Sequence, residues 1–451
     1  MDLDDVKWVE LHYTDLKGVL RSVTVNSSLI NDEIFEKGFG KLDGSSVDLS
    51  PIHDSDLVLK PLKSTYSYVP WTKGGRYICQ IFKDGSRFIK DPRYVAESLE
   101  EYLRGLSCEA YAGVELEFFL FNGIKVLTSP NRYIYEIITK EAMWEADEAS
   151  IPFKRAYHVT MPYDTTYMVR AEASDILGKY FNILVTFHHH EVASGTQAEI
   201  VINKDTPLKL ADNIQTVKYV LKNVAKSHGL YACFMPKPIY GDNGSGLHIH
   251  LSLWRDGKNL FYDENDDYAE LSQLGRYFIG GLIEHGRALA ALVAPTTNSY
   301  RRLVPGYEAP VYLTWSRGNR SVAIRVPSYH KKDMHSKRIE FRPSDPTANP
   351  YLAIPAIFMA GLDGIKKSRD PGDPTDIDVY KLPSSKLREL GIRSLPRSLS
   401  EALDELECDN EFLKPVFSSE LLQTYIELKR REIVEIEQHP TPAEMKYYLL
   451  L

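Results

Sequence analysis

The segment His188–Glu199 most constrains the fold of this chain, because it combines a turn signal with charged residues that a sheet rarely carries. Gly195 lies midway between Glu191 and Glu199 with small polar residues on either side, so we predict a β-hairpin with Ser194–Thr196 as its loop. This pairing would place Glu191 opposite Glu199. Two carboxylates that face each other across a sheet repel, which favours a cation between them. An exposed acidic hairpin with a solvated face is the alternative.

Two further strand-like segments carry ionisable residues at alternate positions. Glu115 and Glu117 share one face of the strand predicted over 114–121, and His248 and His250 share one face of the strand predicted over 247–254. Carboxylates are rarely buried without a partner. A structural histidine pair is possible, but acidic pairs on neighbouring strands favour metal ligation.

The overall composition excludes several classes of protein. The 451 residues suffice for two or three domains, and 43% hydrophobic with 26% charged residues is typical of soluble globular proteins. A net charge of -8 argues against a nucleic-acid binder, whose affinity would come from surplus Lys and Arg.

The cysteines and the apolar runs indicate the compartment. Four cysteines lie far apart without paired spacing, so neither a zinc site nor a disulfide framework is expected, and we predict a cytoplasmic protein. The first residues are acidic where a signal peptide would be basic. No apolar run is long enough to cross a membrane, since the best candidate, 351–362, stops at Asp363.

Periodicity predicts an α+β protein with a small first domain. Residues 6–26 are predicted to form two strands joined by a turn at 15–18, followed by a short helix near 28–37 and strands at 56–60 and 76–83. This unit ends near Ser86. We place the domain boundary before the helix that Asp91 caps, which gives domains of residues 1–88 and 89–451.

Two long helices and an apolar tail are predicted in the second domain. Pro207 opens a helix that Gly229 closes, and residues 351–366 form a buried helix. The chain ends in Tyr447–Leu451, which a lone soluble domain would seldom expose, so a partner subunit could cover it.

The predicted metal ligands suit a particular chemistry. Five glutamates and one histidine are oxygen-rich ligands that favour Mg²⁺ or Mn²⁺ over zinc, and their number suggests two ions. Arginines gather downstream of them, as expected for phosphoryl transfer. No G-x-x-x-x-G-K-[ST] loop is present, so a nucleotide-dependent enzyme of another architecture is indicated.

Ten motifs in sequence order make the chain resemble the glutamine synthetases of the prokaryotic class. The resemblance runs from about Trp8 to the C-terminus. The motifs are Asp43–Ser46, Glu115–Glu117, His190–Ala193 with Gln197 and Glu199, Asn243–His250, Asn298–Tyr300, Arg302–Pro310, Asn319–Ser321, Arg338–Glu340 with Arg342, Asp345–Pro346 and Ala348–Pro350.

The resemblance implies a role for each matched residue. Glu117, Glu191 and Glu199 would hold one metal ion, and Glu115, His248 and Glu340 a second ion beside the nucleotide phosphates. The residues that match glutamate and phosphoryl contacts are Asn243, Gly244, Arg302, Arg320 and Arg342. Those that match nucleotide contacts are His250, Ser252, Arg325 and Arg338.

The resemblance also implies a two-step reaction. ATP and glutamate would form γ-glutamyl phosphate, from which ammonia displaces phosphate. Asp43 would reach in from an adjacent subunit to deprotonate ammonium, and Tyr157 and Glu191 would complete the cation pocket. Glu308, on a flap, would shield the intermediate from water.

The fold and assembly follow from the same resemblance. A β-grasp-like N-terminal domain and a catalytic domain with an antiparallel sheet flanked by helices are expected. Hexameric rings or a dodecamer would place active sites between subunits.

The sequence departs from the family near the amine side of the site. Asp48–Ser50 replaces a Gly-Gly-Trp, and Arg155–Ala156 replaces a Gly-Gly. A ligase that uses another amine, such as a polyamine, ethanolamine or methylamine, is therefore an alternative. An inactive structural or regulatory relative is another, although no matched ligand is lost. Tyr380 matches a tyrosine that some members adenylylate, but its flanks differ, so an ordinary surface tyrosine is expected.

Overall fold

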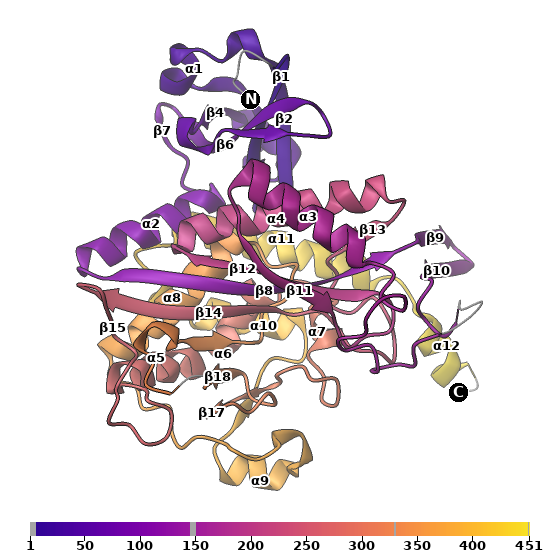
Figure 1. The fold of residues 1–451 in the computed structure, drawn as a ribbon, viewed down its shortest axis with the longest axis vertical. Helices are drawn as coiled ribbons and strands as arrows, with labels where there is room; N and C mark the ends of the chain where they lie inside the picture. Colours follow the sequence, from indigo (N-terminus) through magenta and orange to yellow (C-terminus); the bar gives the residue numbers. More distant parts are fainter. Residues whose placement is uncertain (1–5, 145–149, 329–330, 450) are drawn as a thin grey trace.

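The first strands of the chain form a sheet of their own. The computed structural model describes residues 6–144, 150–328, 331–449 and 451 (Figure 1). The first sheet has the order β2-β1-β6-β4-β3, with β5 and β7 also paired to β6. Its elements are β1 (Trp8–Thr14), β2 (Leu20–Asn26), α1 (Asp32–Lys37), β3 (Phe39–Asp43), β4 (Asp56–Pro61), β5 (Ser67–Val69), β6 (Gly74–Lys83) and β7 (Ser86–Arg87).

The remaining residues build a larger sheet that carries most of the predicted metal ligands. Its order is β11-β12-β8-β14-β19-β18-β17, with neighbours antiparallel except β17 and β18. The strands are β8 (Glu109–Phe121), β11 (Val185–His190), β12 (Gln197–Asp205), β14 (Leu247–Arg255), β17 (Trp315–Arg317), β18 (Ile324–Val326) and β19 (Ile339–Phe341), with the short β13 (Tyr231–Cys233) and β15 (Lys258–Asn259) at its margins. Helices and sheets together confirm the predicted α+β class.

Alternation along the strands separates an apolar face from a polar one. Helix α4 (Pro207–Ser227) covers the apolar face. Its Ile214 and Val217 meet Val114 and Leu116 of β8, together with Ile200 and Ile202 of β12. Because successive strand residues point to opposite faces, Glu115, Glu117 and Glu199 lie on the face away from α4.

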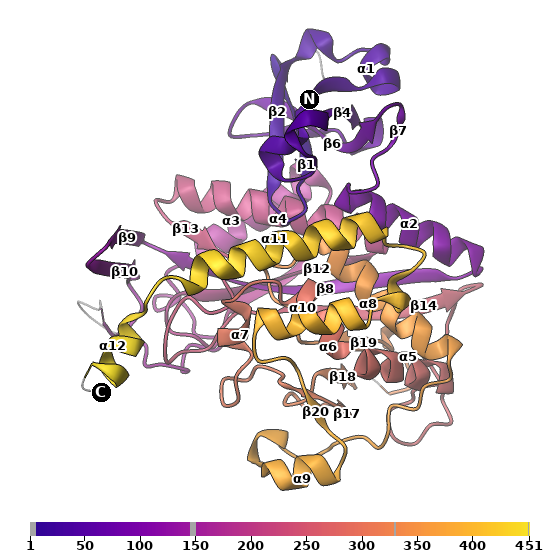
Figure 2. The ribbon, with the colours of Figure 1, turned by 180° about the vertical axis from the view of Figure 1, so that it is seen from behind.

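Helices supply most of the core behind the sheet. In Figure 2, α8, α10 and α11 lie in front of β8 and β14, so they cover the sheet from behind. The helices of this domain are α2 (Pro92–Gly105), α3 (Tyr167–Phe181), α4, α5 (Gln273–Glu284), α6 (Gly286–Val293), α7 (Ser299–Arg302), α8 (Pro350–Lys366), α9 (Ser384–Glu389), α10 (Leu399–Cys408), α11 (Ser419–Glu437) and α12 (Pro442–Tyr448).

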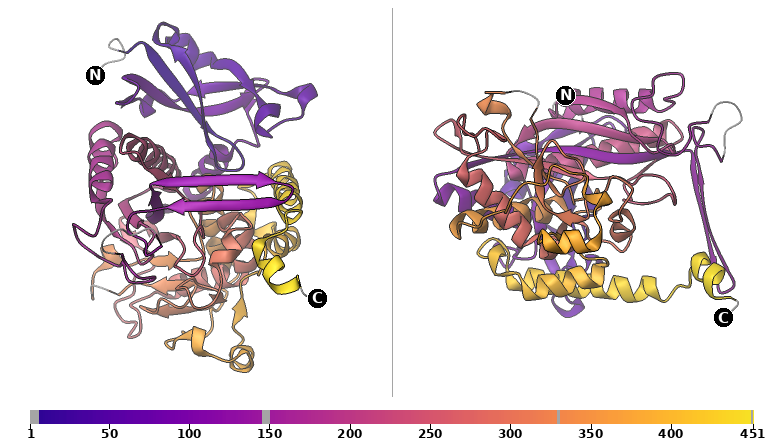
Figure 3. Two further views of the ribbon diagram at one scale, coloured as in Figure 1. Left: turned by 90° about the vertical axis from the view of Figure 1, so that its right-hand side faces the viewer. Right: turned by 90° about the horizontal axis from the view of Figure 1, so that it is seen from below.

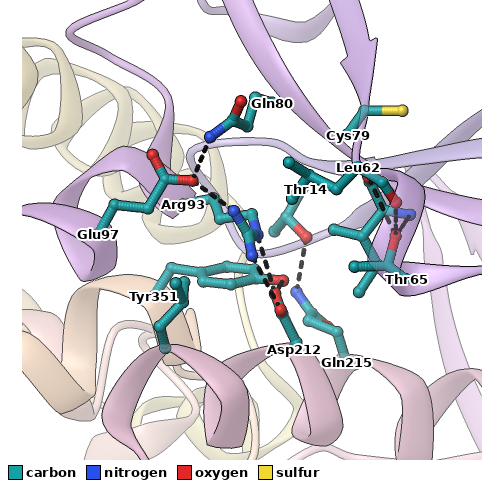
Figure 4. Close-up of polar contacts among 12 residues, drawn as sticks. Thr14, Leu62, Thr65, Cys79, Gln80, Arg93, Glu97, Asp212, Gln215 and Tyr351 are labelled. Carbon is teal, nitrogen blue, oxygen red and sulfur yellow. Dashed lines mark hydrogen bonds and ion pairs between the residues drawn. The ribbon is translucent and has the colours of Figure 1, made fainter. Parts of the chain in front are cut away.

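A buried polar network fastens the first sheet to the helices beneath it (Figure 4). Arg93 of α2 donates from Nε and Nη2 to the two carboxylate oxygens of Asp212 on α4, both at 3.0 Å. The Tyr351 hydroxyl of α8 donates to the same carboxylate at 2.7 Å. Gln215 of α4 donates to Thr14 Oγ1 of β1 at 3.2 Å. One network therefore joins three helices, and a separate bond joins α4 to a strand of the first sheet.

The predicted hairpin pairing is wrong by two residues. Strand β11 ends at His190, and His189 rather than Glu191 lies opposite Glu199. Glu191 begins a loop of residues 191–196, and its backbone N–H donates to the Gln197 carbonyl at 2.9 Å. Thr196 adopts a left-handed φ of 63°, and the loop is longer than the predicted Ser194–Thr196 because it also takes in residues 191–193.

The helix predicted near 28–37 is also interrupted. A 3₁₀ turn over Ser27–Leu29 is followed by α1, whose N-cap is Asn31. The Asn31 side chain accepts from the Ile34 N–H, which starts a new helix and ends the preceding turn.

The C-terminal end and a β-ribbon project from the body of the molecule (Figure 3). The ribbon consists of β9 (Gly123–Ser129) and β10 (Arg132–Ile138), and β16 (Tyr312–Leu313) pairs with β20 (Arg393–Ser394) elsewhere. Tyr447, Tyr448 and Leu449 are exposed, as the apolar tail predicted, while Leu450 lies outside the described residues. Within the described ranges, none of the helices is both long and apolar enough to cross a membrane.

Candidate active site

The ionisable residues of the larger sheet form a continuous band across its strands. Glu199 of β12 lies opposite Glu117 of β8, and Glu115 of β8 lies opposite His248 of β14. On the next strand, Glu340 of β19 pairs with His250 of β14 and with Arg325 of β18. Antiparallel register thus gathers side chains that are more than 200 residues apart in the chain.

The first cluster consists of Glu115, His248 and Glu340. Each offers a ligand atom, and these atoms lie within 4.8 Å of one another. His248 Nδ1 lies 3.1 Å from Glu115 Oε2, so the nitrogen donates to the carboxylate and Nε2 keeps a lone pair in the neutral tautomer. Glu340 is fully buried and Glu115 partly so.

Cationic side chains compensate the charge of this first cluster. Arg325 and Arg342 both form ion pairs with Glu340. Burial would raise the pKa of Glu340, but Arg342 and the neighbouring histidines lower it. Burial would also raise the pKa of Glu115, but hydrogen bonds from His248 and His250 outweigh it and hold this pKa well below its usual range. Both carboxylates are therefore ionised at neutral pH.

The second cluster consists of His189, Glu191 and Glu199, and it lacks such compensation. Its ligand atoms also lie within 4.8 Å of one another, with His189 Nε2 at 3.3 Å from Glu199 Oε1. Burial, then repulsion from Glu117 and Glu199, raises the pKa of Glu191 well above its usual range. Burial and repulsion from surrounding glutamates raise the pKa of Glu199 to about 9.

This imbalance indicates that the donor set fits divalent metal ions. Carboxylates crowded into a buried site are stabilised by a cation, and oxygen donors with one imidazole suit hard divalent ions. The Glu117 carboxylate is fixed beside the second cluster, because its Oε2 accepts from Gly246 N at 2.8 Å and from Gln197 Nε2 at 3.2 Å. The residues present therefore fit two ions.

Loops at one end of the band bring in polar groups for a small substrate. Asn243 is buried, and its Nδ2 lies 3.5 Å from the Glu308 carboxylate. Arg302 is buried and donates from Nη1 to the Pro343 and Ser344 carbonyls, both at 3.1 Å. Gly244 has no room for a side chain, because a Cβ there would lie 2.3 Å from the Pro236 carbonyl oxygen.

The four residues expected to contact a nucleotide lie on adjacent strands. Arg338 Nε donates to His250 Nδ1 at 3.2 Å, so His250 carries its proton on Nε2, 2.9 Å from Glu115 Oε1. Ser252 is buried two residues further along β14, and its Oγ accepts from Trp254 Nε1 at 3.0 Å. Arg325 lies on β18 beside Glu340.

Two expected site residues are exposed near the second cluster. The Tyr157 ring stacks on His158 at a centroid distance of 3.9 Å and meets the edge of His189 at 5.6 Å. Arg320 is exposed in the loop after β17, yet its charge lowers the pKa of Glu199.

Asp43 is not brought to this site by its own chain. It ends β3 in the first sheet, and its side chain is exposed. The carboxylate accepts from Ser46 Oγ at 2.7 Å, Ser45 Oγ at 2.7 Å and Ser45 N at 2.9 Å. These bonds lower the pKa of Asp43, so it presents a fixed negative charge to the outside of the subunit.

Asp242 organises the loops of the site and was not among the predicted site residues. Its buried Oδ1 accepts from the backbone N–H groups of Lys154 and Asn243, both at 3.0 Å. Its Oδ2 accepts from Ser194 N at 2.7 Å and Ser194 Oγ at 2.8 Å. A glycine-rich run with one buried aspartate could have drawn attention to it, whereas His189 was hidden by the shifted hairpin pairing.

Tyr380 is more than the ordinary surface tyrosine that was expected. Its hydroxyl donates to the Ala309 carbonyl at 2.7 Å, next to Glu308, and the side chain is partly buried. Burial raises the pKa of Tyr380 to about 12. The hydroxyl is therefore engaged in fixing the segment that carries Glu308.

Comparisons with known proteins agree over nearly the whole chain. The model of the glutamine synthetase catalytic domain matches residues 89–448, and the model of the glutamine synthetase beta-Grasp domain matches residues 5–84. The glutamine synthetase of Sulfolobus acidocaldarius is 50% identical over 454 residues, which cover 99% of this chain and 96% of the relative. These matches confirm the predicted β-grasp and catalytic folds.

Solved structures give the same result. The cryo-electron microscopy structure of Plasmodium falciparum glutamine synthetase has a TM-score of 0.90 at 29% identity, and the match covers 99% of this chain and 96% of that one. A complex of GmaS with ADP has a TM-score of 0.84 at 30% identity and covers 99% of this chain and 97% of that one. The chain therefore belongs to the glutamine synthetase family, whose members are ligases that use ATP and a divalent metal ion.

Proposed function

We propose that this chain joins ammonia to the γ-carboxylate of L-glutamate with ATP, through γ-glutamyl phosphate, to give glutamine, ADP and phosphate. The observation that carries the proposal is the charge imbalance of the band. One carboxylate cluster is neutralised by arginines and histidines, and a second is left with raised pKa values. Such a site suits an anionic nucleotide on one side and cations on the other.

We assign the two clusters to two divalent ions, Mg²⁺ or Mn²⁺. Glu117, Glu191 and Glu199 would hold one, and Glu115, His248 and Glu340 the other, with His189 next to the first set. Bound divalent ions neutralise phosphate charge and polarise the transferred phosphoryl group. The arginine pairs on Glu340 keep its carboxylate ionised for this role.

The remaining residues would bind and orient the substrates. Arg302, Arg320 and Arg342, with Asn243 and Gly244, are assigned to glutamate and the phosphoryl oxygens. His250, Ser252, Arg325 and Arg338 are assigned to the nucleotide, and the structural likeness to an ADP complex supports a nucleotide site in this fold. Ordered, buried arginines cost little reorganisation when the charge develops.

Ammonium is assigned to an anionic pocket formed by Glu191, Tyr157 and Asp43. Ammonium has no lone pair, so it must lose a proton to a carboxylate before its nitrogen attacks. Because Asp43 is exposed in the first sheet, we infer that it serves a neighbouring subunit in hexameric rings or a dodecamer. The domains that meet there are residues 1–88 of one subunit and residues 89–451 of the next.

Phosphate release from ATP tests this assignment. We would compare ammonium with methylamine, ethanolamine, putrescine and spermidine, each with glutamate and Mg²⁺ or Mn²⁺. Turnover with ammonium and formation of glutamine is the expected result. A preference for a larger amine would mean that Asp48–Ser50 and Arg155–Ala156 have rebuilt the pocket. No phosphate release with any amine in the assembled protein would favour an inactive structural or regulatory relative.

A further inference from the structure

The segment that carries Glu308 is held on both sides of this residue. It runs from the end of α7 to Ala309, and Gly306 and Glu308 adopt left-handed φ values of 94° and 57°. At the far end, the Ala309 carbonyl accepts from the Tyr380 hydroxyl at 2.7 Å. On the other side of Glu308, the Tyr307 ring contacts two lysine side chains.

Two lysines from separate loops lie over the Tyr307 ring. Lys237 Nζ lies 3.7 Å from the ring centroid and Lys154 Nζ lies 4.1 Å from it. Lys154 Nζ also donates to the Gly306 carbonyl at 3.1 Å. We call Tyr307, Lys154 and Lys237 the Tyr307 clasp.

The loops that carry the lysines are fixed to the site itself. The backbone N–H of Lys154 donates to Asp242 Oδ1 at 3.0 Å, and Lys237 Nζ donates to the Asp242 carbonyl. The backbone N–H of Lys237 donates to Asn298 Oδ1 at 2.8 Å. Asp242 also binds Ser194 of the loop that begins with Glu191, so the clasp joins the Glu308 segment to the metal-binding loop.

The negatively polarised face of the Tyr307 ring attracts both ammonium groups. Burial lowers the pKa of Lys237 to about 8, so its ammonium is partly desolvated. Cation–π attraction is stronger where water is excluded.

We propose that Lys154 and Lys237 are positioning residues that hold Tyr307, and with it Glu308, over the reaction centre to exclude water. This inference rests on the proposed function. The acyl phosphate carbon can be attacked by ammonia, which gives glutamine and phosphate, or by water, which gives glutamate and phosphate. The second path reduces the reaction to hydrolysis of ATP to ADP and phosphate, so a segment that opens wastes ATP.

The clasp can be tested without any activity. The protease that cleaves after glutamate cuts the Glu308–Ala309 bond only when the segment opens, and mass spectrometry follows that fragment. We expect Lys154→Met and Lys237→Met each to speed this cut by about fivefold, because each loses one cation–π contact. Tyr307→Leu should do the same, while Tyr307→Phe, which keeps the ring, and the exposed control Lys140→Met should match the parent protein. Unchanged cutting in the folded lysine variants, or equal effects of Phe and Leu, would overturn the clasp.

The ratio of phosphate released to glutamine formed tests whether the clasp excludes water. With glutamate and saturating ammonium, the parent protein should release equal amounts of phosphate and glutamine. The double variant of Lys154 and Lys237 should release about twofold or more phosphate per glutamine, and Tyr307→Phe should stay coupled. Faster cutting with unchanged coupling would refute the role in excluding water. A parent protein that makes no glutamine would refute the proposed function, whereas the cutting experiment would still decide whether the clasp exists.

Discussion

At the scale of single residues, Asp242 shows how one buried carboxylate can fix several loops. It accepts hydrogen bonds from groups on the loops of Lys154, Ser194 and Asn243. Four donors satisfy both oxygens, which is the arrangement that makes a buried aspartate tolerable. The position of Glu191 therefore depends on a residue that touches no substrate.

We predict that Asp242→Asn destabilises the protein by about 1–3 kcal/mol, because an amide nitrogen would face a backbone N–H in place of an acceptor. Urea unfolding measures the loss. A matched exposed change, Asp84→Asn in the turn between β6 and β7, should have no effect. A variant of Asp242 as stable as the parent would show that the loops are held by other contacts.

Removing the charge of Glu199 should stabilise the metal-free protein and weaken the stabilisation that metal gives. Folding raises the pKa of Glu199 to about 9 in the metal-free protein. A carboxyl group with a raised pKa makes the folded protein less stable as the pH rises from the unfolded pKa toward the folded pKa. Glu199→Gln should therefore raise the thermal midpoint of the metal-free protein at pH 8. In the parent protein, Mg²⁺ or Mn²⁺ at about a hundred times the dissociation constant should add about 2.7 kcal/mol.

Differential scanning calorimetry with and without chelator measures both effects. The gain from metal should be much smaller in Glu199→Gln and unchanged in the exposed control Glu264→Gln. A metal-free Glu199→Gln protein less stable than the parent would contradict the charge imbalance of the second cluster.

The residues predicted from the sequence were those whose spacing alone defines a face. Glu115 with Glu117 and His248 with His250 required only the two-residue period of a strand. Glu191 was placed opposite the wrong residue because turn geometry, with Thr196 at positive φ, sets the register and is not visible as composition. Asp242, Lys154 and Lys237 act across loops that meet only after packing.

At the scale of elements, a buried ion pair joins helices α2 and α4 beneath the first sheet. Arg93 and Asp212 are both buried, and Asp212 also accepts from Tyr351 (Figure 4). The pair is satisfied from both sides. Its loss would leave a charged guanidinium in the core between α2, α4 and α8.

We predict that Asp212→Ala costs about 3 kcal/mol of unfolding free energy, because buried Arg93 then keeps only Glu97 as a carboxylate partner and the Tyr351 hydroxyl loses its acceptor. Thermal or urea unfolding gives the value, with Lys209→Ala on the exposed side of α4 as control. A loss below about 1 kcal/mol would mean that water solvates Arg93 once Asp212 is removed.

Another prediction concerns His285, between α5 and α6. Its Nε2 lies 2.9 Å from Asp363 and its Nδ1 lies 2.8 Å from Asp409. Burial lowers the pKa of His285, but the hydrogen bonds to Asp409 and Asp363 outweigh it and raise the pKa above 6.5. A raised histidine pKa stabilises the folded state at low pH, and this contribution is lost as the pH rises through the folded pKa.

His285→Gln should therefore destabilise the protein by about 1.5 kcal/mol at pH 6 and by less at pH 9. Urea unfolding at the two pH values measures the difference. The exposed His53→Gln should behave like the parent at both. Equal losses at pH 6 and pH 9 would show that His285 is not protonated in the folded protein.

Helix ends were readable where side chains cap them. Asp91 with Pro92 starts α2 at the predicted position, and α8 begins at Pro350, one residue before the predicted start. The helix expected near 28–37 failed because Asn31 caps a new helix in its middle, and a cap and an interior polar residue look alike in a sequence. The partners of Arg93 and His285 lie on distant elements, so no local pattern could identify them.

At the scale of the whole molecule, Asp43 lies apart from the residues to which the proposed function joins it. The band of ligands lies on the larger sheet, whereas Asp43 ends a strand of the smaller sheet and faces outward. Its carboxylate is oriented by Ser45 and Ser46 as the N-cap of the turn that follows β3. The exposed apolar tail at Tyr447–Leu449 offers a second surface for contacts between subunits.

If Asp43 serves the site of a neighbouring subunit, two inactive variants should restore activity when they assemble together. Asp43→Asn and Glu191→Gln should each retain about 1% of the parent turnover or less, because each removes a group that handles the ammonium proton. When the two variants are produced together with different tags, and assemblies carrying both tags are isolated, some sites will combine an intact Asp43 with an intact Glu191. In a random ring, that combination arises in about a quarter of the sites, so about a quarter of the parent activity should return. Mixed assemblies no more active than either variant would mean that Asp43 serves its own subunit or none, since neither arrangement lets one inactive variant complete the site of the other.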